Sequence, residues 1–150
     1  MADEPDTPLR YFQKNAQEAI GINIAEWKGQ TRVDVRTYVQ PLGEADLVAT
    51  KKGVAIPLKL FPAVMQGVRE LANVMGPEKT VSRIQKSSRE EIRVGITTYR
   101  GARLIFIRSF ALANDEDSQW RPTRKGVSMR VDLYPHLLEA LEEIEERLND

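Results

Sequence analysis

The chain has 150 residues, no cysteine, one histidine, and equal numbers of basic and acidic side chains, 22 of each. The absence of cysteine excludes disulfides, thiolate metal sites and cysteine nucleophiles. Neither a secretory leader nor an apolar run of membrane-spanning length is visible, which predicts a soluble intracellular protein of the cytoplasm, nucleoid or nucleus, with no membrane partner. The zero net charge conceals a basic middle between two acidic ends, and it is this distribution that bears on nucleic-acid binding.

An internal repeat sets the architecture before any other pattern. The segment 51–62 returns as 124–135 at a shift of 73 residues, and matching positions upstream lie 72 residues apart. Two units of about 70 residues each would be marginally stable alone. We therefore predict that the copies pack together as an intramolecular pseudo-dimer. The predicted divisions are a flexible acidic tail over 1–8, a first repeat over 9–76 and a second repeat over 77–150.

The first repeat shows the alternation of half-buried strands over 17–26 and 31–38. The turn Lys28-Gly29 between them predicts a hairpin. Another strand is expected over 9–13, and an extended segment over 52–58 follows a loop at 41–46. Pro62 suits the first turn of a helix, which is expected to end at Gly76-Pro77. Gly67 weakens this helix by about 1 kcal/mol relative to alanine.

The second repeat follows the same order. Strands are expected over 81–85, 92–96, 104–110 and 125–133, with an acidic loop at 114–118 and a helix that begins at Pro135. The predicted fold is therefore α+β, with two tandem ββββα units. Each unit is an antiparallel four-stranded sheet with a C-terminal helix, and each sheet should bury one face under a helix and leave the other free.

The sequence predicts no enzyme, because no nucleophile, general base or metal constellation is visible. No catalytic residue, metal ligand or cofactor is assigned. His136 is expected to be structural or exposed. The carboxylates at 139–146 have helical spacing away from the apolar stripe and are expected to form a solvated face, with binding of a basic partner as the alternative.

Binding residues are more abundant than catalytic ones. An aromatic residue and a cation lie together at each predicted hairpin tip, and further cations lie on the strands that follow. Aromatic rings beside cations suit single-stranded nucleic acid, whose bases stack while its phosphates pair with lysine and arginine. The alternative is that the rings pack as hairpin core and the charges only confer solubility. The candidate nucleic-acid-binding residues are Trp27, Lys28, Arg36, Lys51, Lys52, Tyr99, Arg100, Arg108, Trp120, Arg121, Arg124 and Lys125.

The order of these motifs resembles the positive cofactor 4 family of transcriptional coactivators. In each copy an aromatic-cation-glycine turn precedes a strand arginine, then a basic block, then a helix begun by proline, from about Leu9 to Leu148. The resemblance implies single-stranded DNA-binding domains of four strands and a helix that act as dimers. It places the family's hairpin aromatic on Trp27 and Tyr99, and its strand arginine on Arg36 and Arg108.

The chain also departs from the family pattern. Gln30 and Ala102 stand at a family lysine, and Val39 and Ala111 at a family tryptophan, for which Trp120 is a candidate replacement. Asp34 of the first copy becomes Phe106 in the second. The strand face of Leu104, Phe106 and Phe110 is unusually apolar for a wetted surface, which indicates contact with another chain or with a base stack.

The function expected from the resemblance is non-catalytic binding of single-stranded DNA with little sequence preference, linked to transcription, replication or repair. Transcription or replication proteins are expected partners, and further self-association stays open. Two alternatives remain: a protein-interaction adaptor with weak nucleic-acid affinity, and an RNA-binding protein.

Overall fold

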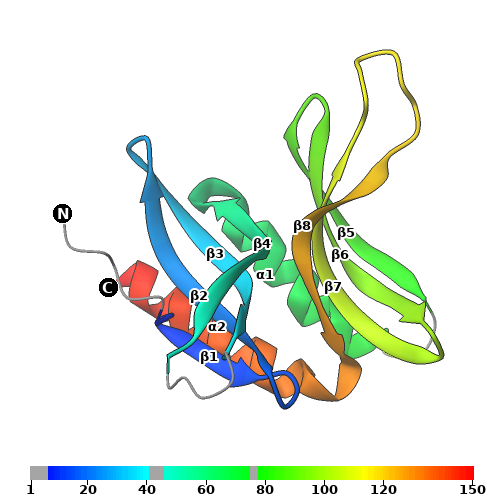
Figure 1. Ribbon diagram of the computed structural model, residues 1–150. Helices are drawn as coiled ribbons and strands as arrows, with labels where there is room; N and C mark the ends of the chain where they lie inside the picture. Colours follow the sequence, from blue (N-terminus) through cyan, green and yellow to red (C-terminus); the bar gives the residue numbers. More distant parts are fainter. Residues whose placement is uncertain (1–6, 41–45, 75–77) are drawn as a thin grey trace.

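The computed structural model describes residues 7–40, 46–74 and 78–150 (Figure 1). The first repeat contains β1 (Arg10–Gln13), β2 (Glu18–Trp27), β3 (Gln30–Val39), β4 (Val48–Pro57), a 3₁₀ turn (Leu58–Leu60), α1 (Phe61–Glu70) and a second 3₁₀ turn (Leu71–Asn73). The second repeat contains β5 (Lys79–Ser87), β6 (Glu90–Tyr99), β7 (Ala102–Ala111), β8 (Arg121–Arg130), a 3₁₀ turn (Val131–Leu133) and α2 (Tyr134–Asn149). The predicted pair of ββββα units is confirmed.

Each repeat forms an antiparallel sheet whose strands lie in chain order, β1-β2-β3-β4 and β5-β6-β7-β8. The predicted alternation sets the register. Ile22 lies opposite Val35, which lies opposite Val54, and all three side chains are buried. The residues between them point to the other face of the sheet because side chains alternate along a strand. That outer face carries Arg32, Asp34 and Arg36, the one predicted binding residue of β3.

The buried face of each sheet is covered by the helix of the other repeat. α1 packs against β5 and β6, whereas α2 packs against β1 and β2. Figure 1 shows α2 beneath the first sheet, although it follows β8 in the chain. The Tyr134 hydroxyl of α2 donates a 2.7 Å hydrogen bond to the carbonyl of Val68 in α1. The two repeats therefore share one apolar core and form the predicted pseudo-dimer.

Gly67 weakens α1 but has a packing role that the sequence did not show. A Cβ atom at this position would lie 2.6 Å from Ser82 Oγ and 3.3 Å from Val94 Cβ, both in the second repeat. These separations are shorter than ordinary van der Waals contact. The glycine therefore lets α1 approach the second sheet closely.

The strand ends differ from the prediction. The segments expected to be extended over 52–58 and 125–133 stop at Pro57 and Arg130, and a 3₁₀ turn follows each. The turn redirects the chain from the sheet edge into the helix that begins beside Pro62 or Pro135. Predictions for residues 1–6, 41–45 and 75–77 lie outside the described residues. In the part of the chain that the structure describes, no helix has the length and apolarity to span a bilayer.

Candidate nucleic-acid interface

The hairpin tips present aromatic rings to solvent. Lys28 and Gly29 have φ angles of 49° and 77°, and Arg100 and Gly101 have 51° and 79°. Two consecutive positive φ values are typical of a type I′ turn, which matches the twist of the flanking strands. Trp27 is 53% exposed and Tyr99 is 56% exposed, so neither ring is hairpin core.

Cations lie over both tip rings. Lys28 Nζ is 4.5 Å from the centroid of the Trp27 ring, and the guanidinium of Arg32 is 4.4 Å from it. The guanidinium of Arg100 lies 5.2 Å from the Tyr99 ring. The β2–β3 and β6–β7 turns lie at opposite ends of the molecule in Figure 1, so one base cannot contact both tips.

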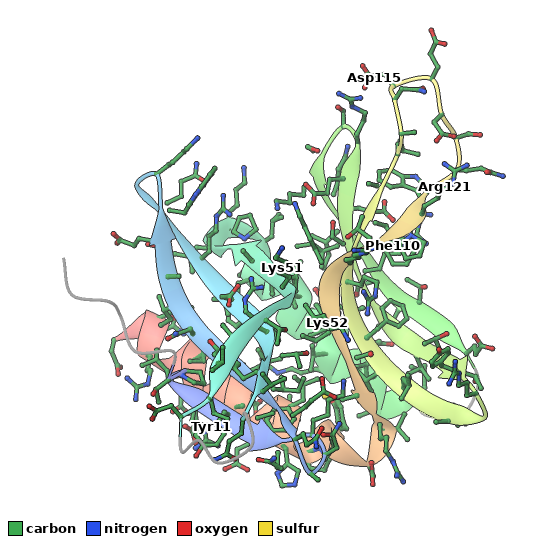
Figure 2. The ribbon with its side chains drawn as sticks, in the orientation of Figure 1. Tyr11, Lys51, Lys52, Phe110, Asp115 and Arg121 are labelled. Atoms are coloured by element: carbon green, nitrogen blue, oxygen red, sulfur yellow. The ribbon has the colours of Figure 1, made fainter. Side chains whose placement is uncertain are left out.

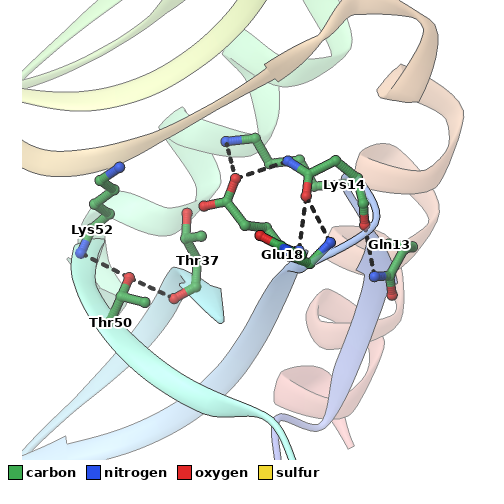
Figure 3. Close-up of polar contacts among 8 residues, drawn as sticks. Gln13, Lys14, Glu18, Thr37, Thr50 and Lys52 are labelled. Carbon is green, nitrogen blue, oxygen red and sulfur yellow. Dashed lines mark hydrogen bonds and ion pairs between the residues drawn. The ribbon is translucent and has the colours of Figure 1, made fainter. Parts of the chain in front are cut away.

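A β-bulge presents the basic block of the first repeat. The ladder between β3 and β4 shifts register between Arg36 and Tyr38. The Thr50 hydroxyl donates to the Thr37 carbonyl at 2.8 Å and accepts from the Lys52 amide at 3.1 Å (Figure 3). Arg36 Nη1 donates to the Thr50 carbonyl at 2.9 Å. These bonds fix the strand where Lys51 and Lys52 project.

The second repeat reproduces this bulge between Arg108 and Phe110. The same three hydrogen bonds, at 3.0, 3.1 and 2.9 Å, join Arg108, Ser109, Thr123 and Lys125. The same irregular geometry recurs in both repeats, which indicates that the bulge belongs to the fold and is not a local distortion. The bulged strands carry Lys51, Lys52, Arg124 and Lys125, which line cavities at the seam where β4 and β8 lie side by side.

The seam contains a cavity of about 480 Å³ whose charged lining residues are all cationic: Lys14, Lys51, Lys52, Arg108 and Arg124. Figure 2 shows Lys51 and Lys52 facing the second sheet across this seam. Sequence reasoning missed Lys14, which lies 3.9 Å from Glu18 (Figure 3). The signal that could have found it is its match to Lys86 in the internal repeat.

A second cavity occupies the equivalent place on the other side of the seam. It has a volume of about 340 Å³ and is lined by Arg32, Arg36, Lys51, Lys86 and Lys125, together with Glu90. Lys86 lies 3.7 Å from Glu90. This side of the seam is therefore basic but partly neutralised.

The two strand arginines differ in electrostatic state. Arg36 donates to both carboxylate oxygens of Asp34, at 3.0 and 2.8 Å, and these bonds raise the pKa of Arg36. Burial lowers the pKa of Arg108. Over residues 7–40, 46–74 and 78–150, no carboxylate forms an ion pair with Arg108. Its charge is free to meet an anion, whereas that of Arg36 is already matched.

Trp120 and Arg121 are not brought to the seam. Arg121 is bound within its own loop, by Asp117 at 3.0 Å and by Gln119 at 3.0 Å. Figure 2 shows Arg121 well away from Lys51 and Lys52. The guanidinium of Arg83 lies 5.9 Å from the Trp120 ring. Arg124 and Lys125, a few residues later, do reach the two seam cavities.

The carboxylates of α2 are less free than expected. Glu139 and Glu143 pair with Arg10 of β1, while Glu142 and Glu145 pair with Arg69 of α1. These ion pairs hold α2 against β1 and α1, so the carboxylates do not form a purely solvated face. His136 is exposed, and its ring is stacked on Phe12 with centroids 6.0 Å apart. Among the described residues, no cluster of three His, Asp or Glu side chains is arranged to hold a metal ion.

The exposed rings, the bulge-directed cations and the basic seam together define a tandem ββββα protein of the nucleic-acid-binding class. Two segments, 14–67 and 86–140, match the profile of the family described as Transcriptional Coactivator p15 (PC4). They cover more than half of the chain, one segment in each repeat. The chain therefore belongs to this family of DNA-binding transcriptional coactivators, as its motifs predicted.

Two solved structures are similar to about half of the chain. BPSL1147, a PC4 homolog from Burkholderia pseudomallei, is 30% identical over 47% of this chain and 92% of its own, with a TM-score of 0.40. The bacteriophage T5 homolog of the eukaryotic coactivator PC4, implicated in recombination-dependent DNA replication, is 21% identical over 48% of this chain and 92% of its own, with a TM-score of 0.34. A search of curated proteins found no match.

Proposed function

We propose that this protein binds single-stranded DNA without catalysis and with little sequence preference, in a process linked to transcription, replication or repair. The observation that carries the proposal is the cationic seam between two sheets whose hairpins expose aromatic rings. Phosphates would pair with the seam and tip cations, and unpaired bases would stack on Trp27 and Tyr99. Duplex DNA hides its base faces, so the same surface should favour unpaired strands.

The test is fluorescence anisotropy of a labelled mixed-sequence strand of about 20 nucleotides, alone and annealed to its complement, over a salt series. The single strand should bind tightly and lose affinity with a logarithmic slope of about −0.7 per phosphate contacted. The duplex should bind weakly. Competition by an RNA strand of the same sequence distinguishes the DNA from the RNA function.

Alanine at Tyr99 should weaken binding by about tenfold, which corresponds to the roughly 1–3 kcal/mol that one base stack contributes. Both tip rings are exposed, so alanine at either should leave circular dichroism and thermal unfolding unchanged. Intact affinity after both changes would exclude stacking at the tips. If neither strand form binds at any salt concentration, the protein-interaction adaptor is the better function.

A further inference from the structure

The outer face of the second sheet is hollowed into a groove. Its volume is about 410 Å³, within the range of small-molecule sites, and no carboxylate lines it. The apolar and aromatic side chains of the groove that matter here are Tyr99, Leu104, Phe106 and Phe110. The sequence placed the last three on one strand face, and the structure confirms that they share the face opposite the core.

The groove is held rigid by its own contacts. Phe106 forms the floor and lies so close over Gly95 that a Cβ atom there would be 2.8 Å from its ring. The rings of Phe106 and Phe110 are tilted with centroids 6.3 Å apart. Arg93 lies 4.1 Å over the Phe110 ring and is fixed by an ion pair with Glu91. A planar apolar ligand would meet preformed walls.

Arg108 joins the groove to the cationic seam. It lines both the apolar groove and the larger basic cavity that contains Lys14, Lys52 and Arg124. Among the described residues, its guanidinium has one hydrogen bond, 2.9 Å long, to the Thr123 carbonyl, which leaves other N–H donors for an anion. A nucleotide has the same two parts, a planar base and a phosphate, at adjacent positions.

The equivalent surface of the first repeat is occupied by its own side chains. Asp34 stands where the second repeat has Phe106, and it pairs with Arg36 at 2.8 Å. Arg32 stands in place of Leu104 and covers the Trp27 ring. Tyr38 stands in place of Phe110 and is 4% exposed.

We propose that the groove of the second repeat is a binding pocket for an unpaired nucleobase, with the adjoining phosphate at Arg108, and that the first repeat has no equivalent pocket. This inference rests on the proposed function. The two repeats of the pseudo-dimer then differ in function. The second repeat holds one base in the groove, whereas the first contributes the Trp27 ring and cations that follow the phosphates.

The test combines protein and ligand changes. Wild type and Phe106→Asp are titrated with an oligothymidine strand of about 12 nucleotides and with a matched abasic strand that keeps the phosphates. Phe106→Asp gives the second repeat the residue that the first already tolerates. The new carboxylate should pair with Arg108 as Asp34 pairs with Arg36. Phe106→Leu keeps the groove apolar while removing the ring, and Trp27→Ala removes the tip ring of the first repeat, the equivalent of Tyr99.

We expect Phe106→Asp to weaken binding of oligothymidine by ten- to a hundredfold, Phe106→Leu by about fivefold and Trp27→Ala, which removes one base stack, by up to about tenfold. On the abasic strand, Phe106→Leu should have no effect, because that strand has no base to stack on the ring. Circular dichroism confirms that each variant is folded.

Three results would overturn the pocket while leaving single-strand binding intact: equal losses for Phe106→Leu on both strands, a larger loss for Trp27→Ala than for Phe106→Asp, or unchanged affinity for Phe106→Asp. Wild type that binds neither strand would instead overturn the proposed function itself. Sedimentation tests the remaining possible occupant, a second copy of the chain. If wild type is a dimer that Phe106→Asp dissociates, and strand affinity is unchanged, the groove is a self-association surface.

Discussion

At each hairpin tip a cation adopts a backbone conformation that costs stability. Lys28 and Arg100 have positive φ values, which asparagine and glycine tolerate better than long side chains. Such strain, of order 1 kcal/mol or more, is found mainly at functional sites. We therefore infer that the tip cations are retained for binding rather than for the turn.

The double variant Lys28→Asn/Arg100→Asn should separate these two effects. Asparagine suits a type I′ turn, so the free energy of unfolding should rise by about 1 kcal/mol. Binding of single-stranded DNA should weaken, and the salt slope should fall by about 0.7 for each phosphate that the variant no longer neutralises. Urea denaturation and anisotropy measure the two quantities. Arg147→Gln, an exposed change on α2, is the control and should leave the salt slope unchanged. A slope that the double variant does not alter would remove the tips from the interface.

Glu91 predicts a stability change in acid. Burial would raise the pKa of this carboxylate, but hydrogen bonds from Arg83 and Arg93 outweigh burial and leave the pKa below its usual value of 4.5. Its stabilising effect is therefore complete above that pH and is lost as the pH falls through the lower folded value. Glu91→Gln should reduce the free energy of unfolding at neutral pH by about 1 kcal/mol, because the Arg83 partner is half exposed.

As the pH falls below about 4.5 the stability curves of wild type and Glu91→Gln should approach each other, and they should meet below the folded pKa of Glu91, where wild type has lost the same charge. Urea denaturation at several pH values measures both curves. Glu146→Gln, an exposed carboxylate change on α2, is the control and should run parallel to wild type. Parallel curves for Glu91→Gln as well would show that the ion pair contributes nothing to folding.

At the level of elements, the sequence predicted the strands well because alternation is a local property. Ile20, Ile22 and Ile24 share a face whatever lies beyond them. The apolar stripe of a helix likewise shows that the helix is covered, but it does not show by which sheet. The exchange of α1 and α2 between repeats depends on contacts such as that of Tyr134 with Val68, which are distant in sequence.

Where the sequence repeats, the structure places the candidate residues at equivalent positions. Trp27 and Tyr99 lie at equivalent tips, and Lys51 and Arg124 at equivalent bulges. The sequence predicted the apolar strand face that lines the groove. It did not predict the cavity, because a run of apolar side chains shows which face they share but not how deeply that face is hollowed. Arg121, predicted from the sequence to bind nucleic acid, lies away from the seam because its loop provides closer partners, which sequence spacing does not reveal.

Gly67 offers a test of the helix exchange. Alanine should gain about 1 kcal/mol of helix propensity, but its Cβ would overlap Ser82 of the other repeat. Overpacking of this kind costs typically 1–3 kcal/mol, so Gly67→Ala should leave stability unchanged or reduce it by up to about 2 kcal/mol. In a Ser82→Gly background the same change should stabilise relative to Ser82→Gly alone. Chemical denaturation of all four proteins gives the coupling energy. Additive effects would mean that α1 does not lie on β5 as described.

For the whole molecule, the exchanged helices make the two repeats mutually dependent. The faces of both sheets contribute to one core, with β2, which carries Ile22, under α2 and β6, which carries Val94, under α1. A repeat that kept its helix but lost its partner would expose an apolar sheet face, which monomeric proteins rarely do. We therefore expect the shared core, more than the covalent link, to hold the two repeats together.

A chain cut between Val74 and Glu78 should accordingly remain a folded one-to-one complex. Neither half expressed alone should give a folded monomer; mixing the halves should restore both the native circular dichroism and the binding of single-stranded DNA. Light scattering after size exclusion measures the stoichiometry. Tyr134→Phe removes the hydrogen bond between the two helices, so the halves carrying it should associate about fivefold more weakly, equivalent to about 1 kcal/mol. Two separate folded monomers would contradict the shared core. A folded homodimer of one half would support it, because the helix of each copy would then cover the sheet of the other, as α1 and α2 do within the single chain.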